Sequence, residues 1–229
     1  MGVIIQDMGV GHNSSASAIN LYSCENSGFN RKLVMMAIAA KDGSIPTPDL
    51  EFDNGGDNTP LTIILNEFVD IPYGGGNYRI TVGYLDNPPL GEYINLASWG
   101  SVADVAAYCW CLSNAKDGID IAADSDEGND SVNVTLGAGD KGDLALTAAI
   151  AIAYDNEVTT YYPTTLSGIS GVIRSGYYTG TTGNGAYGYD YYASKNTNQV
   201  GWSGSHEMSN VLMAAVGIKA AIGKHGMHP

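Results

Sequence analysis

The chain has 229 residues with 24 acidic and 10 basic side chains, which gives a formal charge of -14. A surface of this sign repels nucleic acid and anionic membranes, because phosphate groups are bound by clustered Lys and Arg. Hydrophobic residues make up 44% of the chain, enough to fill one core, and the 30 Gly and 8 Pro indicate many turns and few long helices.

Neither a membrane span nor an export signal is predicted. No apolar run reaches the roughly 18 residues that a membrane-spanning helix needs. Residues 1–19 lack the basic start and the long apolar run of a secretory signal peptide. We therefore expect a protein made in the cytoplasm, with no membrane and no nucleic acid among its partners.

Residues 1–30 are rich in Gly, Ser and Asn and hold only short apolar groups. Such a composition cannot bury enough apolar surface to fold alone. It predicts an extended N-terminal arm that either stays undocked or becomes ordered by adding a strand to another subunit. The expected docking residues are Val3, Ile4, Ile5, Ile19 and Leu21.

Short apolar runs separated by clusters of Gly, Pro, Asn and Asp predict a series of strands, as in a β-sandwich. The run 33–40 is apolar on both faces, which indicates a central strand. In 144–154 the bulky residues alternate with Ala and Thr, so one face fills a core and the other lies under a second layer or a neighbouring subunit. The other expected strands are 49–53, 61–69, 78–85, 92–97, 104–112, 131–136 and 210–219.

Residues 159–204 differ from the rest, because tyrosines alternate there with Gly, Thr, Ser and Asn. We expect long loops, with one hairpin at most, that project from the sandwich. Tyrosine on such a background is typical of loops that bind protein or sugar surfaces. The alternative is that these side chains cover the ends of the core. The candidate binding residues are Tyr177, Tyr178, Tyr187, Tyr189, Tyr191, Tyr192 and Trp202.

Motifs for catalysis and cofactors are weak. The G-x-G-x-x-G match at 137–142 precedes a strand instead of a helix, so it predicts a turn and no nucleotide site. No nucleophile elbow and no zinc-protease motif occur. Cys109 and Cys111 stand too far apart on one strand face to bridge each other, and we expect all three cysteines, with Cys24, to be reduced and packed. An enzyme is not expected.

The segment 124–130 is the best metal candidate. Asp124, Asp126 and Asp130 supply oxygen ligands that suit Ca²⁺, but the Gly is one residue early for an EF-hand loop and the final Glu is missing. An acidic surface loop is the favoured interpretation. No other cofactor is expected.

The order of several motifs is more informative than any one of them. They are Arg31-Lys32-Leu33-Val34, then the segments 50–56, 84–91, 138–146 and 211–220. This ordered set resembles the concanavalin-like jelly-roll domains of tailed-phage virion proteins and some bacterial surface proteins. The resemblance covers about residues 31–221 and implies a jelly-roll β-sandwich of two antiparallel sheets, with the arm 1–30 and a tail 222–229 outside it. It implies no catalytic residues.

These observations predict a non-enzymatic virion structural protein, assembled in the host cytoplasm. The main hypothesis is a capsid decoration or cement protein whose arm docks on the major capsid protein, another virion protein or a sister subunit in a homo-oligomer. Repetition on a symmetric lattice would let many weak contacts add up. A tail or head fibre fits nearly as well. The alternatives are a carbohydrate-binding adhesin that uses the tyrosines on glycans, and a donor-strand filament subunit.

Overall fold

The computed structural model describes residues 2–41, 44–53, 58–70, 77–119, 121–128, 131–152, 176–179, 184–192, 196–203 and 210–221. Their regular elements are all strands, which confirms the predicted all-β fold. They are β1 (Ile4–Asn26), β2 (Lys32–Lys41), β3 (Asp49–Asp53), β4 (Asn58–Pro60), β5 (Thr62–Asp70), β6 (Asn77–Asp86), β7 (Gly91–Ser113), β8 (Ile121–Gly128), β9 (Ser131–Gly139), β10 (Leu144–Ile152), β11 (Gly176–Thr179), β12 (Asn184–Tyr191), β13 (Asn196–Ser203) and β14 (Asn210–Ile218).

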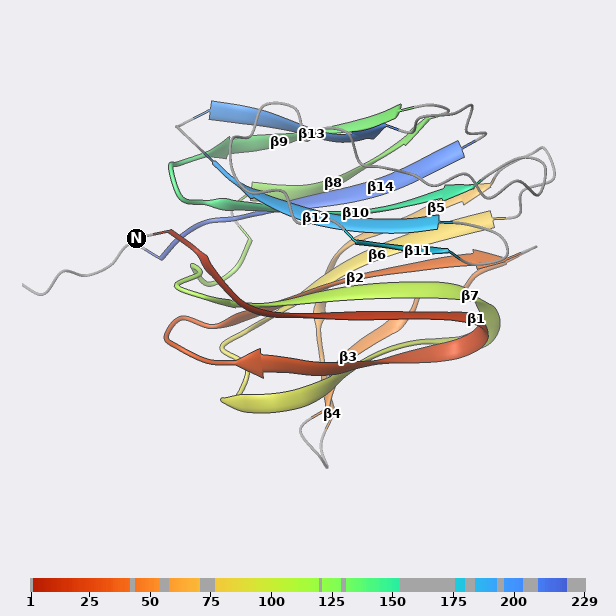
Figure 1. Ribbon diagram of the computed structural model, residues 1–229, viewed down its shortest axis with the longest axis horizontal. Helices are drawn as coiled ribbons and strands as arrows, with labels where there is room; N and C mark the ends of the chain where they lie inside the picture. Colours follow the sequence, from red (N-terminus) through yellow and green to blue (C-terminus); the bar gives the residue numbers. More distant parts are fainter. Residues whose placement is uncertain are drawn as a thin grey trace, which may run out of the picture.

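The strands form three antiparallel sheets that stack in layers (Figure 1). The seven-stranded sheet has the order β4-β3-β7-β2-β6-β5, with β1 paired to β7, and the five-stranded sheet has the order β11-β12-β10-β14-β8. A two-stranded sheet of β9 and β13 lies on the far side of the five-stranded sheet. The arrangement is that of a β-sandwich with added layers, and its strand order does not confirm a jelly roll. Across the described ranges no helix could span a membrane.

Two long strands fold the seven-stranded sheet over on itself. β1 and β7 pair along their whole length and turn together at one side of the molecule (Figure 1). Register shifts between Asn13 and Ala18 interrupt the ladder there, as expected where a strand bends. β2 pairs with the second half of β7 and β3 with its first half, so the halves belong to different layers. The expected strands 92–97 and 104–112 are therefore one bent strand.

The alternation along β2 explains how two cores form. Val34, Met36 and Ile38 enter the upper core, between the seven-stranded and five-stranded sheets. The alternate residues, among them Leu33 and Met35, enter the lower core, between the two halves of the folded sheet. Both faces are buried, which confirms that this doubly apolar run is a central strand.

β10 shows the same principle with smaller side chains. Leu144 and Leu146 point into the upper core. Ala145 and Thr147 on the opposite face are also fully buried. They lie beneath the β9–β13 sheet, because β10 contacts β13 and β14 contacts β9. The flat face of this strand is therefore covered by a layer of the same chain.

The predicted extended arm is not confirmed. Residues 4–26 form β1, which pairs with β7 of its own chain from Ile4↔Ser113 to Asn26↔Gly91. Val3 is buried in the upper core, and Ile19 and Leu21 are buried in the lower core. A segment poor in apolar residues can be ordered in this way because the neighbouring strand supplies most of the buried surface.

The cysteines correct another expectation. Cys111 is disulfide-bonded, whereas all three cysteines were expected to be reduced. Cys109 is free and fully buried, and burial raises the pKa of its thiol to about 12. Cys24 is the one remaining cysteine of the sequence, and its side chain lies outside the described part of the chain.

Thiol titration checks this assignment. Peptide mapping of the unreduced chain should find Cys111 in a disulfide and Cys109 as a thiol. In the folded protein Cys109 should resist iodoacetamide at pH 8.5, because burial keeps its pKa near 12. An unfolded thiol ionises near about 8.5, so stability should fall as the pH rises from there toward 12. Three titratable thiols in the unreduced chain would contradict the assignment.

Candidate functional site

Three loops meet at one end of the molecule, which we call the loop end and define as residues 27–31, 87–90 and 114–119. The first follows β1, the second precedes β7 and the third follows β7. The first two lie side by side because Asn26 pairs with Gly91 in the β1–β7 ladder. The third is joined to the first by hydrogen bonds from Asn114 N–H to the Phe29 carbonyl (2.8 Å) and from Ala115 N–H to the Asn30 carbonyl (3.0 Å).

Arg31 links the first two loops. Its Nε donates to the Pro88 carbonyl at 2.7 Å and its Nη1 donates to the Gly28 carbonyl at 3.0 Å. The Arg31 carbonyl also accepts a hydrogen bond from Asn87 N–H at 2.7 Å. The planar guanidinium holds both carbonyls in fixed directions. One side chain therefore sets the position of both loops.

Lys32 attaches the third loop to the sheet. Its side chain is fully buried, and Nζ forms an ion pair with Asp86. Nζ also donates to the Gly118 carbonyl at 2.9 Å, and Gly118 N–H donates to Asp86 Oδ2 at 2.7 Å. The ammonium lies 4.7 Å from the centre of the Tyr84 ring. A buried cation needs this many partners because it has lost its water.

Backbone conformation adds to the order of the loop end. Asn30, Asn87 and Asn114 have φ values of 50°, 51° and 54°, in the left-handed region that Asn tolerates better than most residues. Gly28 has φ 77°, and a Cβ there would lie 2.9 Å from the Ser113 Cβ. The three loops are thus specified by their sequence as turns of defined shape.

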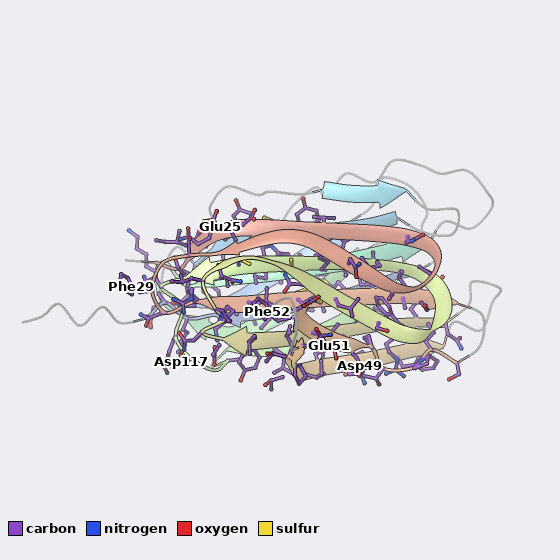
Figure 2. All side chains as sticks on the ribbon, turned by 90° about the horizontal axis from the view of Figure 1, so that it is seen from below. Glu25, Phe29, Asp49, Glu51, Phe52 and Asp117 are labelled. Carbon is purple, nitrogen blue, oxygen red and sulfur yellow. The ribbon has the colours of Figure 1, made fainter. Side chains whose placement is uncertain are left out.

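This ordered frame presents two large apolar side chains to solvent. Phe29 is 88% exposed and Leu90 is 61% exposed. Figure 2 shows Phe29 at the edge of the molecule, at the same end as Glu25 and Asp117. Exposed apolar side chains on a rigid frame lose little entropy when a partner covers them. The arrangement suits docking to another surface.

The predicted docking residues lie elsewhere and are mostly buried. Val3, Ile19 and Leu21 are 2%, 5% and 0% exposed, and Ile5 is half-buried against the upper core. Ile4 is 40% exposed. Most of this set therefore serves the fold of its own chain.

Tyr187, Tyr189 and Tyr191 lie on one face of β12, half-buried against the upper core. The Tyr187 ring lies 5.0 Å from Tyr108 and 6.3 Å from Trp110, centre to centre. β12 pairs with β10 within the five-stranded sheet, instead of projecting as a loop. These three tyrosines therefore cover the core, which is the alternative that the sequence left open.

Tyr191 brings two predicted sets together. Its hydroxyl forms a hydrogen bond with the backbone of Ile5, a residue of the expected docking arm. Burial raises the pKa of Tyr191, with a smaller contribution from Tyr189. Tyr192 is fully buried on the other side, where its hydroxyl donates to the Gly137 carbonyl at 3.2 Å. Tyr177 and Tyr178 belong to β11 and Trp202 to β13, and their side chains lie outside the described residues.

The calcium candidate is not a loop over most of its length. Asp124 and Asp126 lie in β8, where they pair with Ala215 and Met213 of β14. Asp130 lies outside the described residues. The described residues contain no group of three or more His, Cys, Asp or Glu placed to hold a metal ion.

The second half of the G-x-G-x-x-G match lies in the turn between β9 and β10, and its first half ends β9. Asp143 is buried there, and its carboxylate accepts hydrogen bonds from Asp140 N–H at 2.7 Å and Ala220 N–H at 2.8 Å. The Gly142 carbonyl accepts a hydrogen bond from Val3 N–H at 2.9 Å. This turn therefore joins both ends of the described chain to the sandwich.

The sequence analysis missed Phe29 and Leu90. A usable signal exists, because each is a large apolar residue inside a turn sequence: Phe29 stands between Gly28 and Asn30, and Leu90 between Pro89 and Gly91. Large apolar residues have no structural role in most turns, where Gly, Pro, Asn and Asp dominate.

Comparisons with known proteins give no family for this chain. No family model matches it, and searches of curated proteins and of solved structures find no match. The resemblance to phage jelly-roll domains therefore stays a prediction.

Proposed function

We propose that this chain is a non-enzymatic virion structural protein that decorates the outside of a capsid and docks through its loop end. The observation that carries the proposal is the exposure of Phe29 and Leu90 on three loops held by Arg31 and Lys32. Aromatic side chains of this kind are typical centres of protein interfaces.

The use of charged groups also supports a structural role. Arg31, Lys32, Asp86 and Asp143 are charged side chains that hold loops and turns together in the described residues discussed above. Each has its partners within the fold. Catalytic groups, by contrast, usually face a cleft where substrate can reach them.

The virion part of the proposal comes from the ordered motifs of residues 31–220. The disulfide at Cys111 fits it, because disulfides persist on virion surfaces outside the reducing cytoplasm. On a symmetric capsid each loop end can bind weakly, since the lattice repeats the contact many times. The loop end takes the docking role that the sequence analysis assigned to residues 1–30.

Immunogold electron microscopy of a lysate from the source tests this function, with an antibody against the folded domain. Gold spread evenly over icosahedral heads is the expected result. Gold at tail tips would move the proposal to a fibre role. Gold on cell surfaces or on filaments without heads would contradict a virion protein and favour the adhesin or the filament subunit.

A further inference from the structure

We propose that two copies of this chain exchange β1, so that the β1 of each copy completes the β1–β7 ladder of the other. The pair closes on itself, because each copy gives one strand and receives one. The proposal goes beyond capsid docking and does not depend on it, since the donated strand and the groove that accepts it belong to this chain. Three observations carry it: β1 pairs with one strand, its two halves hold each other, and a short strained loop joins it to β2.

β1 can leave its place by opening a single ladder. Within the described residues it pairs with β7 alone, from Ile4↔Ser113 to Asn26↔Gly91. β2 and β3 pair with β7 in the two layers of the folded sheet (Figure 1). The other strands therefore keep their order when β1 of one copy replaces β1 of another.

The two halves of β1 contact each other as well as β7. The Asp7 carboxylate accepts a hydrogen bond from Glu25 N–H at 3.0 Å, and Ser27 Oγ donates to Gln6 Oε1 at 2.9 Å. Gly11 lies so close to the second half of the strand that a Cβ there would overlap its side chains. β1 is therefore a bent element with internal contacts, which it keeps when it moves from one copy to the other.

The groove that accepts β1 is specific for this sequence. Val3 N–H donates to the Gly142 carbonyl at 2.9 Å, and Asn114 Nδ2 donates to the Gly2 carbonyl at 2.8 Å. Val3 is buried in the upper core and Leu21 in the lower core. A second copy offers the same acceptors, donors and cores in the same places. Its groove therefore binds a β1 from either chain, by the strand addition that pairs open sheet edges.

The loop that joins β1 to β2, residues 27–31, is the hinge of the exchange. It leads from Asn26, paired with the first half of β7, to Lys32, paired with the second half. Gly28 and Asn30 have φ values of 77° and 50° in this turn, in the left-handed region that residues other than Gly adopt at a cost. Short hinges under strain favour exchange, because a hinge that continues to a second copy can extend.

Exchange requires chains that are concentrated and reduced. The hydrogen bonds from Asn114 and Ala115 N–H to carbonyls of the hinge stabilise the closed single chain, which therefore prevails in dilute solution. Because the pair forms from two copies, its fraction rises with concentration. Disulfides persist outside the reducing cytoplasm, so exchange between new chains precedes the disulfide at Cys111.

Size-exclusion chromatography with light scattering tests the proposal on the full chain, refolded in dithiothreitol over a range of concentrations. The natural chain should give a dimer whose fraction rises with concentration. Gly28→Ala should raise the dimer association constant at least about tenfold, because the new Cβ strains the closed hinge and lies 2.9 Å from the Ser113 Cβ. Gly118→Ala is the matched control and should change the constant less than about twofold. Gly118 has φ 71° at the same end of the molecule, but it lies outside the hinge.

A second hinge variant should act in the opposite direction. An insertion of Gly-Ser-Gly after Ser27 lets the closed hinge relax and should lower the association constant below that of the natural chain. A general loss of stability would not produce opposite changes from two hinge variants. The comparison of this insertion with the natural chain also stands if Gly28→Ala is too unstable to fold.

Photo-crosslinking identifies the strand that is exchanged. Benzoylphenylalanine replaces Ile4, which is 40% exposed and pairs with Ser113 of β7. Isotope-labelled and unlabelled chains are mixed before refolding, and the isolated dimer is irradiated. Peptide mapping should find β1 peptides of one label joined to β7 peptides of the other label.

Four results would each overturn the proposal: cross-links of β1 only to β7 of the same label, a natural chain that stays single at every concentration, an equal rise from Gly118→Ala, or open polymers in place of a closed dimer. The immunogold experiment tests the capsid role separately. An exchanged dimer that is absent from capsids keeps strand exchange and contradicts the virion role. Gold on heads together with a chain that never exchanges has the reverse meaning.

Discussion

Removal of residues 1–26 should unfold the protein, because β1 is part of both cores. Leu21 is fully buried and Ile19 is 5% exposed in the lower core, and Val3 is buried in the upper core. Losing one such side chain costs about 2–4 kcal/mol, so losing the whole strand exceeds the roughly 5–15 kcal/mol that stabilises a typical domain. The truncated chain is expected to lose its near-UV circular dichroism and to aggregate.

A single substitution makes the same test without deleting a strand. Leu21→Ala should lower the free energy of unfolding by about 2–4 kcal/mol, measured by urea denaturation. Ile4→Ala is the matched control in the same strand, because Ile4 is 40% exposed, and it should cost less than about 1 kcal/mol. Equal, small effects at both positions would show that residues 4–26 do not pack as β1 and would restore the docking arm.

Asp86→Asn should destabilise the protein by about 3–5 kcal/mol, because it leaves the buried Lys32 ammonium without its counter-ion. Asn keeps the shape of Asp, but its single carbonyl oxygen can accept from Gly118 N–H or from Lys32 Nζ and not from both, so the loss combines the charge with one hydrogen bond. Urea denaturation measures it. Asp117→Asn is the control, since Asp117 is an exposed carboxylate of the loop end that accepts from Asn87 Nδ2 at 3.1 Å. It should change stability by less than about 1 kcal/mol.

The double variant Lys32→Met and Asp86→Asn separates charge from packing. It buries no charge, so it should recover most of the stability that Asp86→Asn loses. If the double variant is instead less stable than Asp86→Asn, the hydrogen bond to the Gly118 carbonyl and the Tyr84 contact matter more than the ion pair. In either case the replacement of Lys32 is expected to disorder the third loop of the loop end.

These experiments also bear on the docking proposal. Arg31 and Lys32 are consecutive; Arg31 joins the first two loops to each other, and Lys32 holds the third loop to the sheet. A truncation of the N-terminal residues would remove binding by unfolding the chain, so it cannot identify a docking segment. Substitutions at Phe29 and Leu90 leave the frame intact and are the appropriate test.

The sequence could predict the local parts of this fold. The 33–40 run was identifiable as a central strand because both of its faces are apolar, and 144–152 as a strand because its bulk has a period of two. The turn at 140–143 was predictable from its Gly and Asp residues. That β7 is one continuous strand was not predictable, because the polar residues around Gly100 indicate a break between two strands. Gly100 is exposed at the bend, with φ 63°, and a Cβ added there would meet nothing within 4 Å.

The candidate site was harder to predict, because the strand pairing decides which residues that are distant in the sequence lie side by side. The tyrosines of β12 and the apolar residues of β1 suggested two separate binding sites, yet Tyr191 meets Ile5 beside the upper core. Phe29 and Leu90 are 61 positions apart in the sequence, and the pairing of Asn26 with Gly91 brings their loops together.

The sequence by itself determined the all-β class, the central strand β2 and the covered face of β10, because alternation along a strand shows which of its faces can meet water. Only the tertiary structure decided that residues 4–26 are an integral strand and that Phe29 and Leu90 remain outside. Burial depends on the neighbours of a side chain, and those neighbours are set by long-range pairs such as Leu21 with Asn95. No local pattern in residues 1–30 predicts that Leu21 pairs with Asn95.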